Sequence, residues 1–214
     1  MTPLDRIIKN IPLKFFTDVM DETNGAWAKA YKETQNLYEA PERPNMLGQN
    51  RHAFSESAFR EAAIASDLYC EIPHTEPAGG RYSLISTNNV YLIRSNIQAH
   101  CGIPKPTAFR KSWASLNEWL DPTQSDLLKE VKKPDVSRLC AMLIATHGRK
   151  DSDQTVPAFL GIGVPNNAFS RWKIIKPIEY IIRQYHDFDI TVRKDHEAEI
   201  NIKDIAVPRL KRRK

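Results

Sequence analysis

The sequence has few glycines and lacks the glycine-rich motifs that bind nucleotides. Only 8 glycines occur in 214 residues, and neither G-x-x-x-x-G-K-[ST] nor G-x-G-x-x-G is present. The G-x-S-x-G turn of serine hydrolases and the H-E-x-x-H motif of zinc peptidases are also absent. We therefore expect no standard hydrolase or nucleotide-dependent activity, and the sequence predicts no cofactor and no catalytic residue.

Long apolar segments are missing as well. No run approaches the roughly 18 residues that a membrane span needs, and residues 1–16 alternate charged and apolar side chains, without the apolar core of a secretory signal. The sequence therefore predicts a cytoplasmic protein with no membrane partner. The three cysteines, Cys70, Cys101 and Cys140, have no disulfide-framework spacing, so we expect reduced, partly buried thiols.

Excess positive charge is confined to the end of the chain. The net charge is +5, from 31 basic and 26 acidic residues. Five of the basic residues lie in the last six positions, RLKRRK, so residues 1–208 carry 26 of each sign. Like charges keep a short polar segment extended. The sequence therefore predicts one domain over residues 1–208 and a disordered basic tail over residues 209–214.

Residues 79–98 predict a β-hairpin at the centre of the fold. Two runs rich in Tyr, Ile, Leu and Val flank Asn88 and Asn89, and asparagine tolerates the positive φ angles of a two-residue turn. This turn would place Ile85 opposite Leu92. The residues expected on one face are Tyr82, Leu84, Tyr91, Ile93 and Ile97, and those on the other are Ile85, Val90 and Leu92. Two apolar faces indicate a hairpin inside the protein.

The remaining segments predict helices between further strand pairs. Helical spacing of apolar residues indicates helices over 11–21, 24–38, 55–68, 107–120, 121–131 and 177–185, with a loop over 41–52. Strands are expected over 69–72, over 138–146 and 156–164 as antiparallel neighbours, and in a last hairpin over 190–202. Antiparallel pairs interrupted by helices predict an α+β fold, with a mainly antiparallel sheet built from β-hairpins, helices packed on it and a helical N-terminal segment.

Gly161 and Gly163 fall on the same side of the strand over 156–164 as Phe159. Glycine in a strand leaves room for another group to approach closely. We expect a packed aromatic ring there, with a ligand as the alternative.

One group of residues has the chemistry of a zinc site. Cys70 and His74 precede the central hairpin and His100 and Cys101 follow it, so the hairpin would bring four soft ligands together. However, adjacent residues usually point apart, and the spacings match no standard zinc finger. Loop and core roles are favoured, and we predict no metal.

The loop over residues 147–153 is the most polar connection between two buried strands. It offers His147, Arg149, Lys150, Asp151 and Asp153, which could bind phosphate or a divalent ion, because rigid sheets often position functional loops. The alternative is a solvated loop without a ligand.

Arg81 and Arg94 lie on one face of the predicted hairpin. They could contact phosphates beside Ile85 and Leu92, or they could pair with acids from a covering helix. The second interpretation is favoured.

The order of helix, hairpin and helix resembles the core of PD-(D/E)XK nucleases. That core needs carboxylates on adjacent strands to hold a metal ion. The strands over residues 81–97 contain no Asp or Glu, and the nearby E-x-K, residues 130–132, ends a predicted helix. The required residues are missing at the required places, and the sequence indicates no family.

These observations favour a nucleic-acid-associated binding protein that uses cations rather than a catalytic motif. The residues expected to contact phosphates are Arg81, Arg94, Arg149, Lys150, Arg209, Lys211, Arg212, Arg213 and Lys214. The first alternative is a protein–protein interaction module that uses the helix face of Trp27 and Tyr31. The second alternative is a divergent metal-dependent nuclease or phosphodiesterase.

Overall fold

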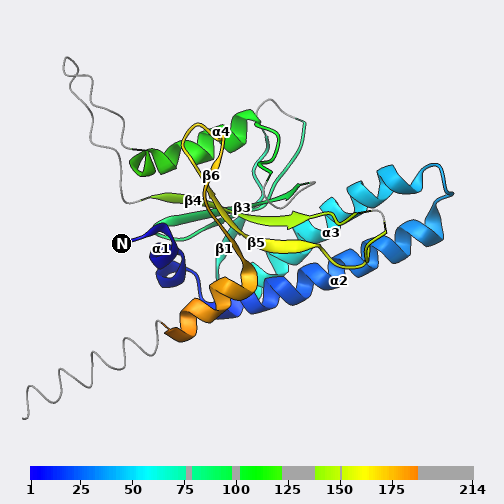
Figure 1. Cartoon of the computed structure of the whole chain (residues 1–214), viewed down its shortest axis with the longest axis horizontal. Helices are drawn as coiled ribbons and strands as arrows, with labels where there is room; N and C mark the ends of the chain where they lie inside the picture. Colours follow the sequence, from blue (N-terminus) through cyan, green and yellow to red (C-terminus); the bar gives the residue numbers. More distant parts are fainter. Residues whose placement is uncertain (76–78, 98–101, 122–137, 150, 188–214) are drawn as a thin grey trace, which may run out of the picture.

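Two long helices, a six-stranded sheet and several short helices make up the described part of the chain (Figure 1). The structure, a computed structural model, describes residues 1–75, 79–97, 102–121, 138–149 and 151–187. The helices are α1 (Pro3–Asn10), α2 (Leu13–Leu37), α3 (Arg43–Ala65), α4 (Ala108–Ala114), the 3₁₀ helix η1 (Ser115–Leu120) and a helix over residues 178–187. The strands are β1 (Tyr69–Glu71), β2 (Leu84–Ser86), β3 (Val90–Ile97), β4 (Leu139–Thr146), β5 (Phe159–Pro165) and β6 (Trp172–Pro177).

The six strands form one sheet in the order β1-β2-β3-β4-β5-β6. β3 and β4 pair in parallel, and each of the other neighbouring pairs is antiparallel. This topology confirms the predicted α+β class with a mainly antiparallel sheet, and it confirms that β4 and β5 are antiparallel neighbours. The sequence did not predict the parallel pairing of β3 with β4. Because β3 and β4 run in the same direction, their carboxyl ends lie at the same end of the sheet.

The central hairpin has the predicted register. Ile85 lies opposite Leu92, and the amide of Thr87 donates a hydrogen bond of 2.9 Å to the carbonyl of Val90 to close the turn. The two predicted faces are also confirmed, because their side chains belong to different buried clusters. Both faces of β3 are therefore inside the protein.

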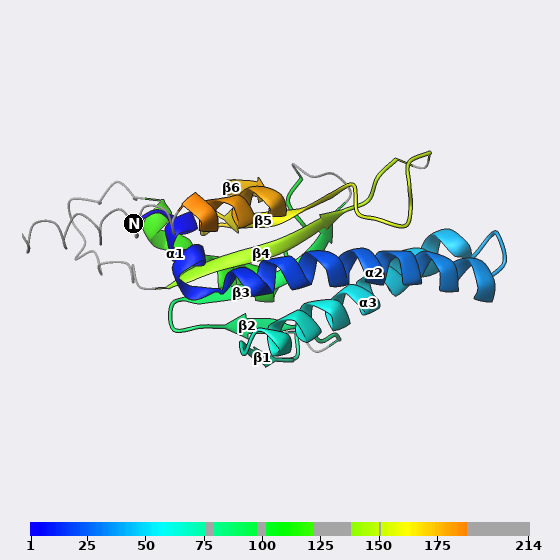
Figure 2. The same cartoon turned by 90° about the horizontal axis from the view of Figure 1, so that it is seen from below.

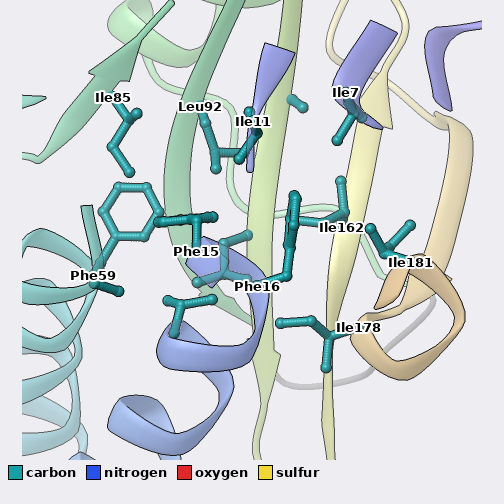
Figure 3. Packing of buried hydrophobic residues seen from close by; sticks show 14 of the residues in the cluster. Ile7, Ile11, Phe15, Phe16, Phe59, Ile85, Leu92, Ile162, Ile178 and Ile181 are labelled. Carbon is teal, nitrogen blue, oxygen red and sulfur yellow. The ribbon is translucent and has the colours of Figure 1, made fainter. Parts of the chain in front are cut away.

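Helices α1, α2, α3 and the helix over 178–187 cover one face of the sheet (Figure 2). Phe15 of α2 lies at the centre of this core, with its ring edge-on to Phe16 and Phe59 at centroid distances of 5.2 and 5.9 Å. Ile85 and Leu92 of the hairpin meet these rings from the sheet (Figure 3). Phe15, Phe16 and Val19 thus dock the N-terminal part of α2 on the sheet.

Helix α4 covers the other face of the sheet, opposite α2 and α3 (Figure 1). Its Phe109 and Trp113 pack on a second apolar cluster that includes Leu84, Ile93 and Met142. The described residues therefore form three layers, with the sheet between α4 on one side and the longer helices on the other.

The glycines of β5 make room for aromatic rings, as predicted. A Cβ atom on Gly163 would lie 2.7 Å from the ring of Trp172, and one on Gly161 would overlap the ring of Phe159 and the backbone of β6.

The N-terminal helices correct two sequence predictions. One helix of 25 residues, α2, replaces the two predicted over 11–21 and 24–38, so the chain is helical without a break through residues 22–24. Helix α3 begins at Arg43, within the predicted loop over 41–52. Pro44 lies in its first turn, where the missing N–H is tolerated, and Gly48 costs only about 1 kcal/mol relative to alanine. Packing of the two helices against each other outweighs these local preferences.

The C-terminal half contains one strand that the sequence did not predict. Trp172–Pro177 forms β6 beside β5, whereas the helix predicted from Pro177 begins one residue later and continues through the last described residue. The predicted helix over 121–131, the hairpin over 190–202 and the tail over 209–214 lie outside the described residues. Within the described chain, no helix is both long and apolar enough to cross a membrane.

Candidate functional site

Basic side chains gather at the end of the sheet where β3 and β4 finish. β2 is antiparallel to β3, so the residues that precede β2 lie at this end too. We call this region the basic end; its cations include Arg51, Arg81, Arg94, Lys105, Arg110 and Arg149. Its acids include Glu56, Asp151 and Asp153, of which Asp153 bonds to the amide and hydroxyl of Thr155.

A pocket of about 490 Å³ opens at the basic end. Its lining includes Asn96, Ile97, Ile103, Pro104, Lys105 and His147. This volume falls in the usual range for small-ligand sites, roughly 300–1,000 Å³. None of the described residues around this first pocket is acidic, so its charged and polar lining favours an anion.

Arg51 of α3 is a buried cation beside the first pocket. Only 3% of the residue is exposed, and its guanidinium lies 4.2 Å from the ring centroid of Trp27. Its Nη1 lies 2.9 Å from Nδ1 of His147, and its Nη2 donates to the backbone and side-chain oxygens of Gln154. Burial lowers the pKa of Arg51 to about 10, so the group stays charged at neutral pH.

No carboxylate in the described chain pairs with Arg51. Its polar partners are an imidazole and the amide and carbonyl oxygens of Gln154, and its Nε is buried without a hydrogen bond. Buried charges in proteins are normally paired or neutralised. An unpaired buried guanidinium is therefore a cost to folding that a bound anion would offset.

The contact with Arg51 determines the protonation of His147. A guanidinium only donates hydrogen bonds, so Nδ1 of His147 accepts and the ring proton is on Nε2. Burial, together with the charge of Arg51, lowers the pKa of His147, which keeps the ring neutral. In a neutral imidazole whose Nδ1 already accepts a hydrogen bond, the Nε2–H group can still donate one. His147 is therefore suited to hold an anion rather than to act as a base.

Arg94, one of the predicted phosphate contacts, is enclosed by the protein. Its Nη1 lies 2.9 Å from Oε1 of Glu56, and the two side chains are 2% and 10% exposed. Glu56 also accepts a hydrogen bond of 2.9 Å from the amide of Ser83. Glu56 lies on α3, which covers the sheet. Arg94 therefore pairs with an acid from a covering helix, which is the favoured interpretation from the sequence. The arginine supports the basic end from inside and presents no surface to a phosphate.

Arg110 connects the first pocket to α4. Its Nη2 donates to Oγ of Ser95 at 3.2 Å and its Nη1 donates to the carbonyl of Lys105 at 2.8 Å, while Nε is buried without a partner. Burial and the nearby charge of Arg94 lower the pKa of Arg110, against the opposing effect of Glu56. The side chain thus anchors the rim of the first pocket to β3.

The other predicted phosphate contacts have different positions. Arg81 is exposed, and its backbone forms a bridge with His74. Arg149 is exposed on the loop that follows β4. The structure therefore places Arg81 and Arg149 at the same end of the sheet as Arg94. Lys150 and the tail, Arg209 and residues 211–214, lie outside the described residues.

The sequence reasoning missed Arg51 and Arg110. Arg51 precedes Ser55 by four residues, so it continues the buried side of α3 by one turn; extending the predicted helix upstream would have revealed it. For Arg110 no local signal exists, because its anchor on the sheet, Ser95 of β3, lies 15 positions earlier in the chain.

The alternative functions gain no support from the described residues. Trp27 is fully buried, so it contributes nothing to an exposed interaction face. No group of three or more His, Cys, Asp or Glu residues in the described ranges could hold a metal ion. Cys70 and His74 are described, whereas His100 and Cys101 of the considered zinc group are not. Cys70 and Cys140 are free thiols.

Comparisons with protein families, with curated proteins and with solved structures found no match to this chain.

Proposed function

We propose that the protein binds nucleic acid, with a backbone phosphate seated in the first pocket. The observation that carries this proposal is Arg51, a buried guanidinium without a carboxylate partner in the described chain, beside a pocket whose described lining has no acid. Arginine, lysine and neutral donors are the groups that contact phosphate oxygens in nucleic-acid complexes. In this proposal Lys105 and Nε2 of His147 contact the phosphate directly, and Arg51 contributes its charge from behind His147.

Several features favour a polyanion over a free small anion. Arg149 and Arg81 extend the positive charge beyond the first pocket along the same end of the sheet, and the sequence ends in five further cations within six residues. Cations spaced along a surface match a chain of phosphates better than a single ion. The contacts are to the backbone, so we expect little dependence on base sequence from this part of the surface.

Charge reversal at the rim of the first pocket tests this proposal. Lys105→Glu and Arg149→Glu should each weaken binding of a fluorescein-labelled 20-nucleotide DNA or RNA, measured by anisotropy at low salt. The matched control is Arg138→Glu, which makes the same charge change immediately before β4, roughly 25–30 Å from the far end of that strand. Binding that is unaffected by the rim variants, or equally weakened by the control, would contradict the proposed site.

The basic tail is a second part of the proposal. Each phosphate that is neutralised releases counterions, so five engaged tail cations would give a slope of log K against log salt of about −4 to −5 on duplex DNA. Deletion of residues 209–214 should lower affinity for all sequences alike and flatten that slope. Unchanged affinity after the deletion would show that the tail does not bind phosphates, and the rim variants would still test the first pocket.

A further inference from the structure

A second pocket, of about 400 Å³, lies beside the first and is lined by aromatic rings. Its lining includes Pro73, His74, Tyr82, Phe109, Ser112 and Trp113. Phe109 and Trp113 come from α4, and Tyr82 precedes β2 at the basic end of the sheet. The pocket thus combines flat apolar surfaces with the polar groups of His74, Tyr82 and Ser112.

The aromatic rings of the second pocket are held in place by the protein. Tyr82 and Phe109 stack with a centroid distance of 4.4 Å and an interplanar angle of 24°. Trp113 stacks on Tyr91 at 5.0 Å and 28°, and its Nε1 donates a hydrogen bond of 2.8 Å to the hydroxyl of Tyr82. Fixed rings lose little conformational entropy when another flat group stacks on them.

Arg110 and Lys105 join the two pockets. Phe109, in the second pocket, lies under the guanidinium of Arg110 at 5.1 Å, and Arg110 donates to the carbonyl of Lys105, which lines the first pocket. Arg81 precedes Tyr82 in the chain and pairs through its backbone with His74, and both Tyr82 and His74 line the second pocket. Cations therefore adjoin the aromatic lining, where they could contact the phosphates that flank a bound base.

We infer that the second pocket accepts an unpaired nucleobase, and that the preferred ligand is single-stranded nucleic acid. This inference rests on the proposed function, because the phosphates of the same strand would occupy the first pocket and its rim. Aromatic platforms beside a basic groove are how single strands are bound without sequence preference. A base in a duplex is stacked and paired, so it could enter the second pocket only after it leaves the helix.

The test compares three labelled 20-mers: oligo(dT), an abasic strand with the same phosphates, and a duplex. Stacking of one base contributes about 1–3 kcal/mol, which corresponds to a factor of about 5 to 150 in affinity. The protein should therefore bind oligo(dT) at least about fivefold more tightly than the abasic strand. Oligo(U) RNA in the same assay distinguishes RNA from DNA as the source of the base.

Phe109→Leu keeps an apolar side chain and removes the ring on which Tyr82 stacks, which loosens the aromatic lining of the second pocket. In this variant the preference for oligo(dT) over the abasic strand should become smaller, and duplex binding should be unchanged. Phe54→Leu, which alters a half-buried ring on α3, is the matched control and should leave the preference for oligo(dT) intact.

Two failures can be told apart. If the protein binds neither the three DNA 20-mers nor oligo(U) RNA at low salt, the proposed function is wrong and this inference falls with it. If it binds all three equally, or if Phe109→Leu retains the full preference for oligo(dT), the base pocket is wrong while phosphate binding stands.

Discussion

Arg94 of β3 and Glu56 of α3 form an ion pair inside the protein, with Nη1 and Oε1 2.9 Å apart. Glu56 binds the amide of Ser83 with its other oxygen, and Arg94 reaches Asn96 at the first pocket with its other nitrogen. The pair therefore connects α3, the entrance to β2 and the end of β3. Because these three elements form the basic end, the pair is expected to support the shape of the site as well as the stability of the fold.

Removal of Glu56 should be strongly destabilising. Glu56→Ala leaves the Arg94 charge and the Ser83 amide buried without their partner, and breaking a buried pair from one side typically costs about 3–5 kcal/mol. Urea unfolding would measure this loss. The control is Glu33→Ala, which breaks a 4.0 Å contact with Lys29 on the surface of α2 and should change the free energy of unfolding by less than about 1 kcal/mol. Similar losses in both variants would contradict this role for the pair.

The central hairpin and strands β4 and β5 could be predicted from the sequence because their signals are local, whereas β6 and the parallel pairing of β3 with β4 could not. Alternation around Asn88 and Asn89 determines which side chains of the hairpin share a face, and the register in the structure agrees. The uniformly apolar run that became β4 is buried at all of its residues. These patterns reflect a period of two that depends only on the strand itself, so one sequence is enough to read them.

The site could be predicted only in part because it depends on contacts between distant segments. Arg51 and His147 are 96 positions apart and Arg94 and Glu56 are 38 apart, and no periodicity encodes which cation meets which acid. Arg94 was therefore identified as a candidate phosphate contact although the fold encloses it. Arg51 was not identified for a different reason. Pro44, Gly48 and their polar neighbours are typical of a loop, so the sequence predicts no helix that would bury Arg51.

Acidification should weaken the fold through His147. Burial and the charge of Arg51 lower the pKa of this imidazole below its ordinary value of 6.5. Between that lowered pKa and 6.5 the unfolded chain binds more protons than the folded one, so the free energy of unfolding falls as the pH decreases below about 6.5. Above about pH 6.5 His147 contributes nothing to the pH dependence of the free energy of unfolding.

His147→Asn should reduce this pH dependence. The Oδ1 of asparagine can accept the Arg51 hydrogen bond in place of Nδ1, but it does not titrate. Urea unfolding at pH 7.5, 6.5 and 5.5 should show a smaller loss of stability in the variant than in the original protein. Some slope should remain, because the pKa of His52 is also lowered, first by burial and then by Arg94, against the effect of Glu56. An identical slope in both proteins would show that His147 is not held neutral by the fold.

Gly163 of β5 should not tolerate a side chain while Trp172 of β6 is present. A Cβ at this position would lie 2.7 Å from the indole ring, and overpacking of this kind typically costs about 1–3 kcal/mol. Gly163→Ala should therefore lower the free energy of unfolding. Its cost should be smaller when Trp172 is already Leu, because the ring that the methyl group meets is then absent. Equal costs in the two backgrounds would contradict the packing of Trp172 over Gly163.

The same substitution at Gly25 should have the opposite sign. Gly25 is exposed in the middle of α2, and a Cβ there would meet no atom within 4 Å. Glycine in a helix interior is less stable than alanine by about 0.5–1 kcal/mol, since the unfolded chain loses more freedom when it folds. Gly25→Ala should raise the free energy of unfolding by that amount, measured in urea beside Gly163→Ala. Destabilisation would show that α2 is interrupted near Asn24, as the sequence alone had suggested.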